Sequence, residues 1–329
     1  MNYNVVIFTE CGQKSGFGHI TRCTALYDEV VSIGFKPLFV ISSDTALGDV
    51  IKHRQYVIDN WYENWSKYLT GNPYCIIDSY IAPKDLYESI CAKSKKCLFI
   101  DDINRIAYPP GVIVNPSLDS QKIKYTKLPG QVYLLGIDYI ILRKEFQLTY
   151  KRVVKNNVGD VLVTLGGSDI LNLTPQILTL LDKPKYSHIQ KHVVLGKGYD
   201  NFEDIKYRMS SSIAFYRNID AYEMQQLMTK CDLAITAAGQ TIYELMATEL
   251  PFVCVKVADN QENNIKGLLE NHIIETYINA ISNPISSELA FHIDRLCKFH
   301  ERLKFIENIN NNFNAKGAKN IVKELLKVL

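Results

Sequence analysis

Length, composition and charge exclude several classes of protein. The chain has 329 residues, of which 47% are hydrophobic and 22% are charged. This composition is typical of a globular protein, and the length provides apolar material for about two domains. The 37 lysines and arginines nearly balance the 35 aspartates and glutamates, which gives a formal net charge of +2. Such a balance argues against nucleic acid or an anionic membrane as a partner.

The sequence shows no pattern typical of secretion or membrane insertion. Its first residues lack the basic stretch and apolar core of a signal peptide, and no apolar run approaches the roughly 20 residues that span a bilayer. The eight cysteines are scattered without a Cys-x-x-Cys pair, which favours buried thiols over a disulfide framework. We therefore expect a cytoplasmic protein without an integral membrane segment.

Short apolar runs alternate with longer amphipathic segments, a pattern typical of a parallel sheet covered by helices. After the first strand a helix is predicted over 18–33, and Gly34 ends it. A polar, basic stretch at 143–159 predicts the domain boundary, and from about 282 the pattern is helical to the end. The predicted strands are 3–8, 36–42, 74–80, 96–102, 111–115 and 131–136, then 161–167, 192–196, 212–217, 233–239 and 251–257.

The predicted fold class is therefore α/β, with two doubly wound, Rossmann-like domains in tandem. The first domain is predicted over 1–145 and the second over 158–329, the latter ending in a helical extension. In such sheets ligands bind beyond the carboxyl ends of the strands, so the expected site is a cleft between the two domains.

Three predicted turns share a plan that favours phosphate binding, because each joins a strand to a helix through small residues. Glycine lets a ligand approach the backbone closely, and the free N–H groups at a helix start favour an anion. Two of the turns lie in the second half, which suggests a diphosphate there. Ordinary turns, with Asp169 and Thr241 as helix caps, are the alternative, and none matches a Walker A or clean GxGxxG motif. The residues are Gly16 and Gly18, then Gly166, Gly167, Ser168 and Asp169, then Ala238, Gly239, Gln240 and Thr241.

The segment 237–268 adds polar side chains to the third turn. Glu244 lies one helical turn after Thr241, where its carboxylate can accept hydrogen bonds from ribose hydroxyls or simply interact with the helix dipole. Asp259, Asn260 and Gln261 follow a predicted strand and can hydrogen-bond sugar hydroxyls or acetamido groups. A generic polar turn has the same composition.

His19 is the candidate catalytic residue of the first half. An imidazole, with an ordinary pKa of roughly 6.5, can act as a base near neutral pH, and a helix start disfavours its charged form. Glu10 is placed to orient the imidazole or to share its proton, while a helix-capping role for His19 remains the alternative. Arg22 either contacts phosphate or projects to solvent. The histidines show no metal-ligand spacing, so we expect no metal.

Several motifs occur in the order seen in one group of nucleotide-sugar hydrolases. The chain resembles the UDP-sugar hydrolases of pseudaminic acid biosynthesis and their relatives in spore-coat polysaccharide synthesis. The motifs are GFGHITR, IIDSY, IDD, LLGIDYIILRKEF, VLVTLGGSD, LMTKCDLAITAAGQTIYELMATELP and ADNQ.

This resemblance implies a GT-B architecture with the sugar at the N-terminal domain and UDP on the C-terminal one. It implies inverting hydrolysis of UDP-2,4-diacetamido-2,4,6-trideoxy-β-L-altrose, without metal or cofactor, to UDP and free sugar. It also implies that His19 handles the attacking water and that Tyr80 and Asn260 line the sugar pocket.

The chain departs from the resemblance after the first strand. Many relatives carry an arginine-x-aspartate pair where this chain has Phe8 and Glu10. The acid is kept and the arginine is lost, which leaves the sugar open. A glycosyltransferase that passes the sugar to a hydroxyl acceptor is the alternative function.

Overall fold

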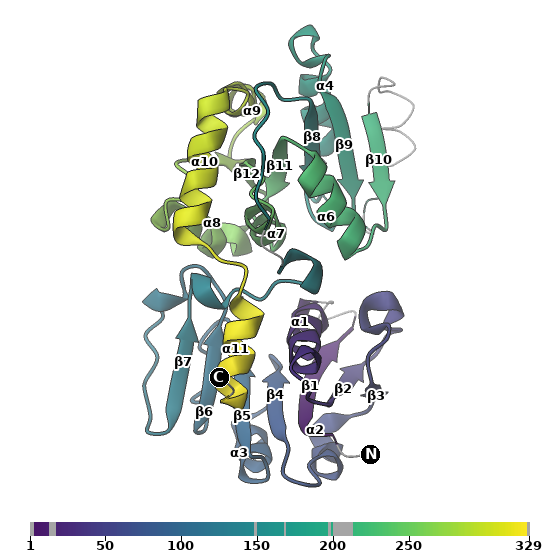
Figure 1. Cartoon of the computed structure of the whole chain (residues 1–329), viewed down its shortest axis with the longest axis vertical. Coiled ribbons are helices and arrows are strands. Elements are labelled where there is room, and N and C mark those ends of the chain that lie inside the picture. The colour runs from purple at the N-terminus through teal and green to yellow at the C-terminus, as the bar shows by residue number, and fades with distance from the viewer. Residues whose placement is uncertain are drawn as a thin grey trace. The chain divides into compact units, whose positions relative to one another are not determined.

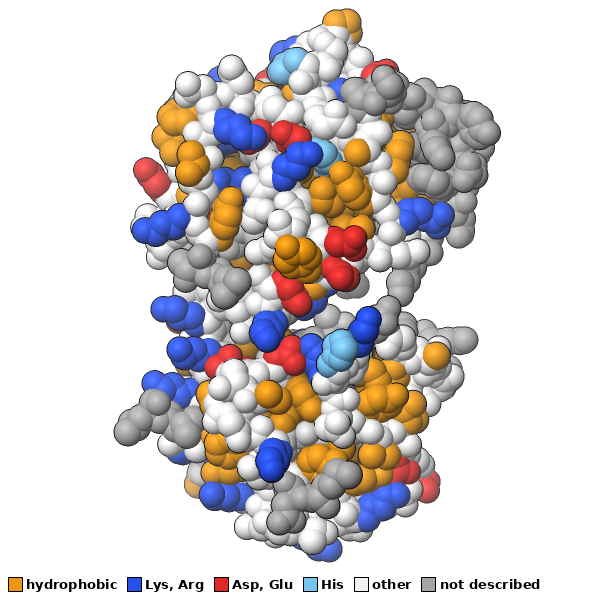
Figure 2. Space-filling model, turned by 45° about the vertical axis from the view of Figure 1, so that its right-hand side comes forward, with side chains coloured by type: hydrophobic (Ala, Val, Ile, Leu, Met, Phe, Trp, Pro, Cys, Tyr) orange, Lys and Arg blue, Asp and Glu red, His pale blue; other side chains and the backbone are white. Residues whose placement is uncertain are grey.

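The computed structural model describes residues 3–12, 18–147, 150–167, 169–196, 199 and 213–327. The chain divides into two compact units (Figure 1). The first unit comprises residues 1–144 together with 316–329, and the second comprises 145–315. On the face drawn in Figure 2, acidic and basic side chains both occur on each unit, in keeping with the near balance of charge.

The first unit is built on a parallel sheet with the strand order β3-β2-β1-β4-β5-β6-β7. Its described strands are β1 (Val5–Cys11), β2 (Pro37–Ser43), β3 (Tyr56–Ile58), β4 (Tyr74–Asp78), β5 (Lys96–Ile100), β6 (Gly111–Asn115) and β7 (Gln131–Leu135). Its described α-helices are α1 (Gly18–Ser32), α2 (Trp61–Asn64), α3 (Lys84–Ala92) and α11 (Gly317–Leu326).

Strand β1 explains why the first sheet is covered on both faces. Every residue of β1 is buried, and successive side chains point to opposite faces of a strand. Val5 and Ile7 belong to the core cluster that includes residues of α1 and α11, whereas Val6 and Phe8 belong to the cluster that includes residues of α3. An uninterrupted apolar run is therefore what a central parallel strand requires.

Helix α11 differs from the sequence-based expectation, which placed everything after 158 in the second domain. Its apolar residues Ala318, Ile321 and Leu325 join the core cluster of the first unit, alongside α1 (Figure 1). A methyl group built on Gly317 would lie 2.0 Å from the carbonyl oxygen of Ile140, so only glycine allows this approach. The periodicity predicted a helix correctly but carried no information about which sheet it covers.

The second unit contains a parallel sheet with the order β10-β9-β8-β11-β12-β13. Its described strands are β8 (Asp160–Thr164), β9 (Gln190–Leu195), β10 (Ile213–Arg217), β11 (Leu233–Ala237), β12 (Phe252–Lys256) and β13 (Ile278–Asn279). Its described α-helices are α4 (Thr174–Leu181), α6 (Ala221–Lys230), α7 (Thr241–Ala247), α8 (Glu262–Glu270), α9 (Ser286–Leu296) and α10 (Phe299–Asn312).

Two arginines, the partly buried Arg152 and the buried Arg302, attach the polar stretch before β8 to the second unit. Arg152 donates to the carbonyl oxygens of Met228, Cys231 and Thr248, where α6 and α7 end. Arg302 donates to the carbonyl oxygens of Lys155 and Asn156 at 2.6 and 3.2 Å. The stretch that the sequence marked as a boundary therefore packs on the second unit.

In each sheet the strand order reverses at one point. There, the connections that leave the carboxyl ends of two adjacent strands run in opposite directions. The reversal lies between β1 and β4 in the first unit and between β8 and β11 in the second. Ligands of doubly wound folds bind at such switch points. None of the helices in the described parts of the chain has the length and apolarity needed to cross a membrane.

Candidate active site

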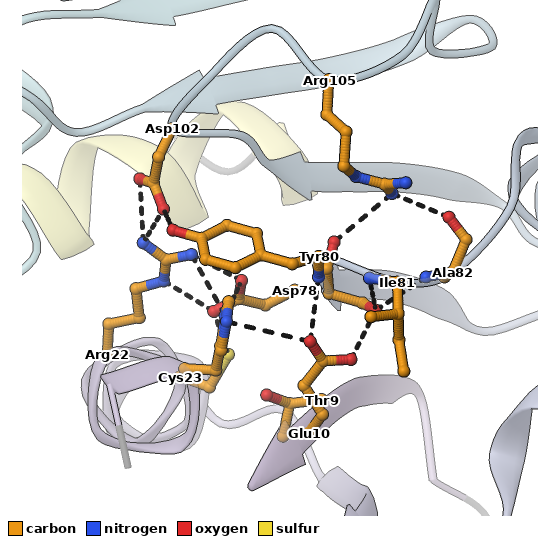
Figure 3. Close-up of polar contacts among 12 residues, drawn as sticks. Thr9, Glu10, Arg22, Cys23, Asp78, Tyr80, Ile81, Ala82, Asp102 and Arg105 are labelled. Carbon is orange, nitrogen blue, oxygen red and sulfur yellow. Dashed lines mark hydrogen bonds and ion pairs between the residues drawn. The ribbon is translucent and has the colours of Figure 1, made fainter. Parts of the chain in front are cut away.

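The switch point of the first unit gathers ionisable side chains from three elements (Figure 3). Glu10 lies near the end of β1, Asp78 is the last residue of β4, and His19 lies in the first turn of α1. The Cα atoms of Thr9 and Asp78 are register partners, so the two strands end side by side. The sequence predicted His19 and Glu10 here but gave Asp78 no role.

Asp78 holds the imidazole of His19. His19 Nδ1 lies 2.7 Å from Asp78 Oδ1, and the two residues are 4% and 0% exposed. Burial alone would raise the pKa of Asp78, but the charge and hydrogen bonds of Arg22, together with the hydrogen bond from His19, lower it to about 2. An ionised carboxylate only accepts hydrogen bonds. Nδ1 is therefore the donor, and Nε2 of the neutral ring is the basic nitrogen.

Glu10 faces the other side of the imidazole. Its Oε1 atom lies 3.9 Å from His19 Nε2, which is beyond hydrogen-bond distance. It accepts the backbone N–H of Tyr80 at 2.9 Å, while Oε2 accepts the hydroxyls of Tyr62 at 2.5 Å and Ser79 at 2.6 Å. Burial and the nearby Glu10 raise the pKa of Tyr62, so the tyrosine keeps its proton. The orienting position predicted for Glu10 is thus occupied by Asp78.

Tyr80 lies against the imidazole of His19. Its ring meets that of His19 edge-on, with 4.3 Å between centroids and 82° between planes. The tyrosine is 45% exposed, and its hydroxyl donates to Asp102. A ligand at this switch point would therefore meet the phenol ring before it meets the histidine.

Arg22 does not project freely to solvent, as one sequence-based interpretation had it, because its guanidinium is held between two carboxylates. It donates to Asp78 from Nε and Nη2, both at 2.6 Å, and to Asp102 from Nη1 at 2.6 and 2.9 Å. Its Nη2 also lies 3.3 Å from His19 Nδ1, a longer contact than those to Asp78. Burial lowers the pKa of Arg22, but Asp78 and Asp102 raise it well above the ordinary value.

The other positions that the sequence singled out in the first unit carry no polar side chain that could hydrogen-bond to His19 or its partners. Gly16 lies outside the described residues, and Gly18 begins α1 with open space around it. Phe8 is buried against the rings of Trp61 and Tyr68. The position at which the resemblance predicts an arginine is thus part of the core in this chain.

At the second switch point the backbone is the prominent feature. Gly166 has a φ of 84°, and a methyl group built on Gly196 would lie 2.2 Å from the carbonyl oxygen of Gly167. The end of β9 thus packs directly on the turn after β8. Asp169 accepts the backbone N–H groups of Leu173 and Thr174 at 2.9 and 2.8 Å. It therefore caps the turn before α4, as the alternative interpretation predicted, and Ser168 lies outside the described residues.

The turn after β11 contains Ala238, Gly239 and Gln240 and leads to Thr241, the first residue of α7. Asn264 of α8, which the sequence analysis did not single out, fixes this turn. Its Nδ2 donates to the carbonyl oxygen of Ala238 at 2.8 Å, and its Oδ1 accepts the Tyr243 hydroxyl at 2.8 Å. The feature of the sequence that could have indicated this role is an asparagine in the first turn of a helix that follows a strand-end loop.

The remaining predicted residues lie on α7 and after β12. Glu244 is partly exposed in the first turn of α7. Asp259 and Asn260 are exposed, and Asp259 lies 3.5 Å from Lys256 Nζ. Gln261 uses its Oε1 to accept the backbone N–H of Val257 at 2.9 Å, so this oxygen shapes the loop. Across the residues that the structure describes, no group of three or more His, Cys, Asp or Glu side chains is placed to hold a metal ion.

Comparison with solved structures defines the class of this fold. The crystal structure of MurG from Acinetobacter baumannii superposes with a TM-score of 0.66 at 11% identity, covering 99% of this chain and all of that one. Arabidopsis thaliana UGT89C1 in complex with UDP-L-rhamnose gives a TM-score of 0.66 at 11% identity, covering 98% of this chain and 99% of that one. At such low identity the likeness concerns the fold alone, which has the GT-B architecture of glycosyltransferases.

The family follows from the sequence profile. The glycosyltransferase family 28 C-terminal domain matches residues 161–325. The chain therefore belongs to this family.

Two curated relatives are of the kinds that the motifs resemble. One is the pseudaminic acid cytidylyltransferase and UDP-2,4-diacetamido-2,4,6-trideoxy-beta-L-altropyranose hydrolase of Helicobacter pylori, 27% identical over 261 residues. The match covers 78% of this chain but 45% of that protein, so this chain spans less than half of that relative's length. The other is the spore coat polysaccharide biosynthesis protein SpsG of Bacillus subtilis, 24% identical over 277 residues and 80% of each chain.

Proposed function

We propose that this chain is an enzyme that hydrolyses a UDP-activated diacetamido-trideoxy sugar at its anomeric C–O bond. The products are UDP and a free sugar of inverted configuration, which would supply nonulosonic acid biosynthesis. The observation that carries the proposal is the His19–Asp78 pair at the first switch point, a buried imidazole held by an ionised carboxylate. The hydrolase named in the Helicobacter pylori relative supports the reaction class.

In the proposed reaction, His19 Nε2 takes a proton from water as the water oxygen bonds to the anomeric carbon. The bond from that carbon to the diphosphate oxygen breaks, and its electron pair leaves with UDP. UDP is a good leaving group, so positioning and electrostatics supply most of the catalysis without a metal. Asp78 keeps the imidazole in the required tautomer and stabilises its protonated form. The Oε1 atom of Glu10 lies 3.9 Å from Nε2. It is placed to accept a hydrogen bond from the second O–H group of the same water.

We assign UDP to the second unit and the anomeric carbon of the sugar to the first. The turns after β8 and β11 present backbone near Gly166, Gly167, Ala238 and Gly239, which suits close approach by a diphosphate. Glu244 is proposed to bind the ribose, and Asn260 and Asp259 to bind the sugar substituents. A cytoplasmic location is proposed because the eight cysteines are scattered and mostly buried thiols.

A glycosyltransferase is the second candidate. The observation that favours it is that MurG and UGT89C1 share this fold over nearly the whole chain. In that case His19 would deprotonate an acceptor hydroxyl instead of water, with the same bond breaking at the anomeric carbon.

Incubation with candidate UDP-sugars separates the two functions. Free UDP and the anomeric proton are followed by NMR with and without EDTA. Release of inverted free sugar without an acceptor, unaffected by EDTA, supports the hydrolase. Turnover only after a hydroxyl acceptor is added supports the transferase, and loss of turnover with EDTA contradicts the metal-free reaction.

A further inference from the structure

A continuous series of polar contacts links the exposed Tyr80 to the buried His19. Its members Tyr80, Asp102, Arg22 and Asp78 are labelled in Figure 3. The Tyr80 hydroxyl donates to Asp102 Oδ2, which also accepts Arg22 Nη1 at 2.6 Å. Arg22 then donates to both oxygens of Asp78, and Asp78 Oδ1 accepts His19 Nδ1. Neither Asp102 nor Arg22 is assigned a step in the reaction above.

Three separate elements contribute to this series. Arg22 projects from α1 one turn after His19, Asp78 ends β4, and Asp102 follows the end of β5. The guanidinium is planar with its donors in a fixed fork, so two carboxylates on it are held at a fixed separation. Its charge persists, because the carboxylates raise the pKa of Arg22 well above the ordinary value despite burial.

The tyrosine is the member that most needs such support. Its side chain is 45% exposed, and the hydroxyl is its far end. Burial, followed by the charge of Asp102, raises the pKa of Tyr80, so the hydroxyl stays a donor to that carboxylate. With its end free, the ring could turn about its side-chain bonds and leave the edge-on contact with His19.

We propose that Asp102 is a positioning residue that holds the Tyr80 ring against His19, and that Arg22 couples this hold to the orientation of the imidazole by Asp78. The inference rests on the proposed function for its kinetic effect, but the placement of the ring is testable without turnover. A mere stabilising salt bridge is the competing explanation, because Arg22 and Asp102 are 17% and 18% exposed.

The chain offers a matched control on the same helix. Asp28 of α1 forms a two-bond ion pair with Arg54, at 2.8 and 2.6 Å, and these side chains are 19% and 20% exposed. The pair resembles Arg22–Asp102 in its number of hydrogen bonds and in burial but includes no residue assigned to the site. Asp28→Ala therefore reports the effect of losing such a pair for stability alone.

The test compares Asp102→Ala, Tyr80→Phe, their double variant and Asp28→Ala. Arg22 keeps its bonds to Asp78 in all four, so the charge of its guanidinium keeps a carboxylate partner. We expect Asp102→Ala to lower kcat about 10- to 100-fold with little change in KM, as small misplacements of reacting groups do. Tyr80→Phe should lower kcat to a similar extent. The double variant should be no less active than either single variant, because both substitutions remove the same hydrogen bond, from the Tyr80 hydroxyl to Asp102.

The turnover-free measurement is the NMR spectrum of the His19 ring protons. The tyrosine ring current should vanish from these resonances in Tyr80→Leu, and Asp102→Ala should shift them toward that spectrum while Asp28→Ala leaves them in place. Unchanged His19 resonances in Asp102→Ala, or equal kinetic effects of Asp102→Ala and Asp28→Ala, overturn the inference.

Should Asp102→Ala fail to fold, Asp102→Asn is used, in which Tyr80 and Arg22 compete for one oxygen and the same shift is smaller. If the wild type releases no UDP from any UDP-sugar, the proposed function fails, and the NMR comparison still decides the positioning.

Discussion

The two switch points of this molecule differ in the groups that form them: side chains in the first unit and mainly backbone in the second. In the first unit, charged side chains converge: His19, Asp78, Arg22 and Asp102 contact one another at 2.6 to 2.9 Å. In the second unit the polar side chains near the switch point shape the loops, as Asp169 and Asn264 do through backbone groups. The first switch point thus presents an imidazole that can accept a proton, and the second presents the backbone of the turns after β8 and β11. The proposed function places bond breaking at the first unit and UDP binding at the second, so the effects of substitutions should divide in the same way.

The largest effect is expected from His19→Ala. Loss of the general base should lower kcat by about 10³-fold, in the range typical of acid–base catalysis. UDP affinity, measured by calorimetry, should stay unchanged because UDP is assigned to the other unit. A clear loss of UDP affinity would contradict the division between the units.

Asp78→Asn should lower kcat by about 10²- to 10⁴-fold, because the amide favours the wrong imidazole tautomer. It should also lower the free energy of unfolding by about 3 kcal/mol, since a buried ion pair with Arg22 is broken. Steady-state kinetics and urea unfolding of the same samples measure the two effects. Wild-type kcat in a folded Asp78→Asn variant would remove Asp78 from the mechanism.

The pKa of Asp78 predicts a pH dependence of stability. The folded protein holds this pKa at about 2, below the ordinary aspartate value of about 3.9. The group therefore contributes stability that is fully present above about pH 4 and is lost as the pH falls toward 2. In urea unfolding between pH 5 and 2, wild type should lose more stability than Asp78→Asn. Parallel curves for the two proteins would contradict the low pKa.

In the second unit, Asn264→Ala should raise KM about tenfold, the equivalent of one lost hydrogen bond, with kcat nearly unchanged. The turn at Ala238 loses its side-chain support, while the first switch point is untouched. Asn263→Ala is the matched control, because Asn263 is the exposed neighbour on the same helix. Equal KM values for the two variants would show that Asn264 does not shape a ligand site.

The smallest effect concerns the packing of α11. Gly317→Ala places a methyl group against the backbone of Tyr139 and Ile140 and should lower the free energy of unfolding by about 2 kcal/mol. Lys319→Ala, at an exposed position of the same helix, should change it by less than about 0.5 kcal/mol. Thermal unfolding detects the difference, and equal stability of the two variants would place α11 elsewhere.

Much of the fold could be predicted because parallel strands are buried on both faces and therefore form continuous apolar runs. Each predicted strand is present, whereas β3 and β13 were missed because one is exposed and the other has two residues. The destination of α11 was not predictable, since its apolar face would fit either sheet.

The site was predicted less completely. His19, Glu10 and Tyr80 were candidates from the sequence, but the partners of charged groups depend on which strand ends are adjacent. Asp78 and Asp102 lie 56 and 80 residues from Arg22 in the chain. Only the strand order β1-β4-β5 brings them together.

Hydrolysis in water labelled with ¹⁸O decides whether His19 activates water against the anomeric carbon. Without any acceptor, the label should enter the anomeric hydroxyl of the first-formed free sugar and be absent from UDP, and His19→Ala should slow the appearance of labelled sugar about 10³-fold. Label in the terminal phosphate of UDP, or release of UDP only when a hydroxyl acceptor is present, would contradict it.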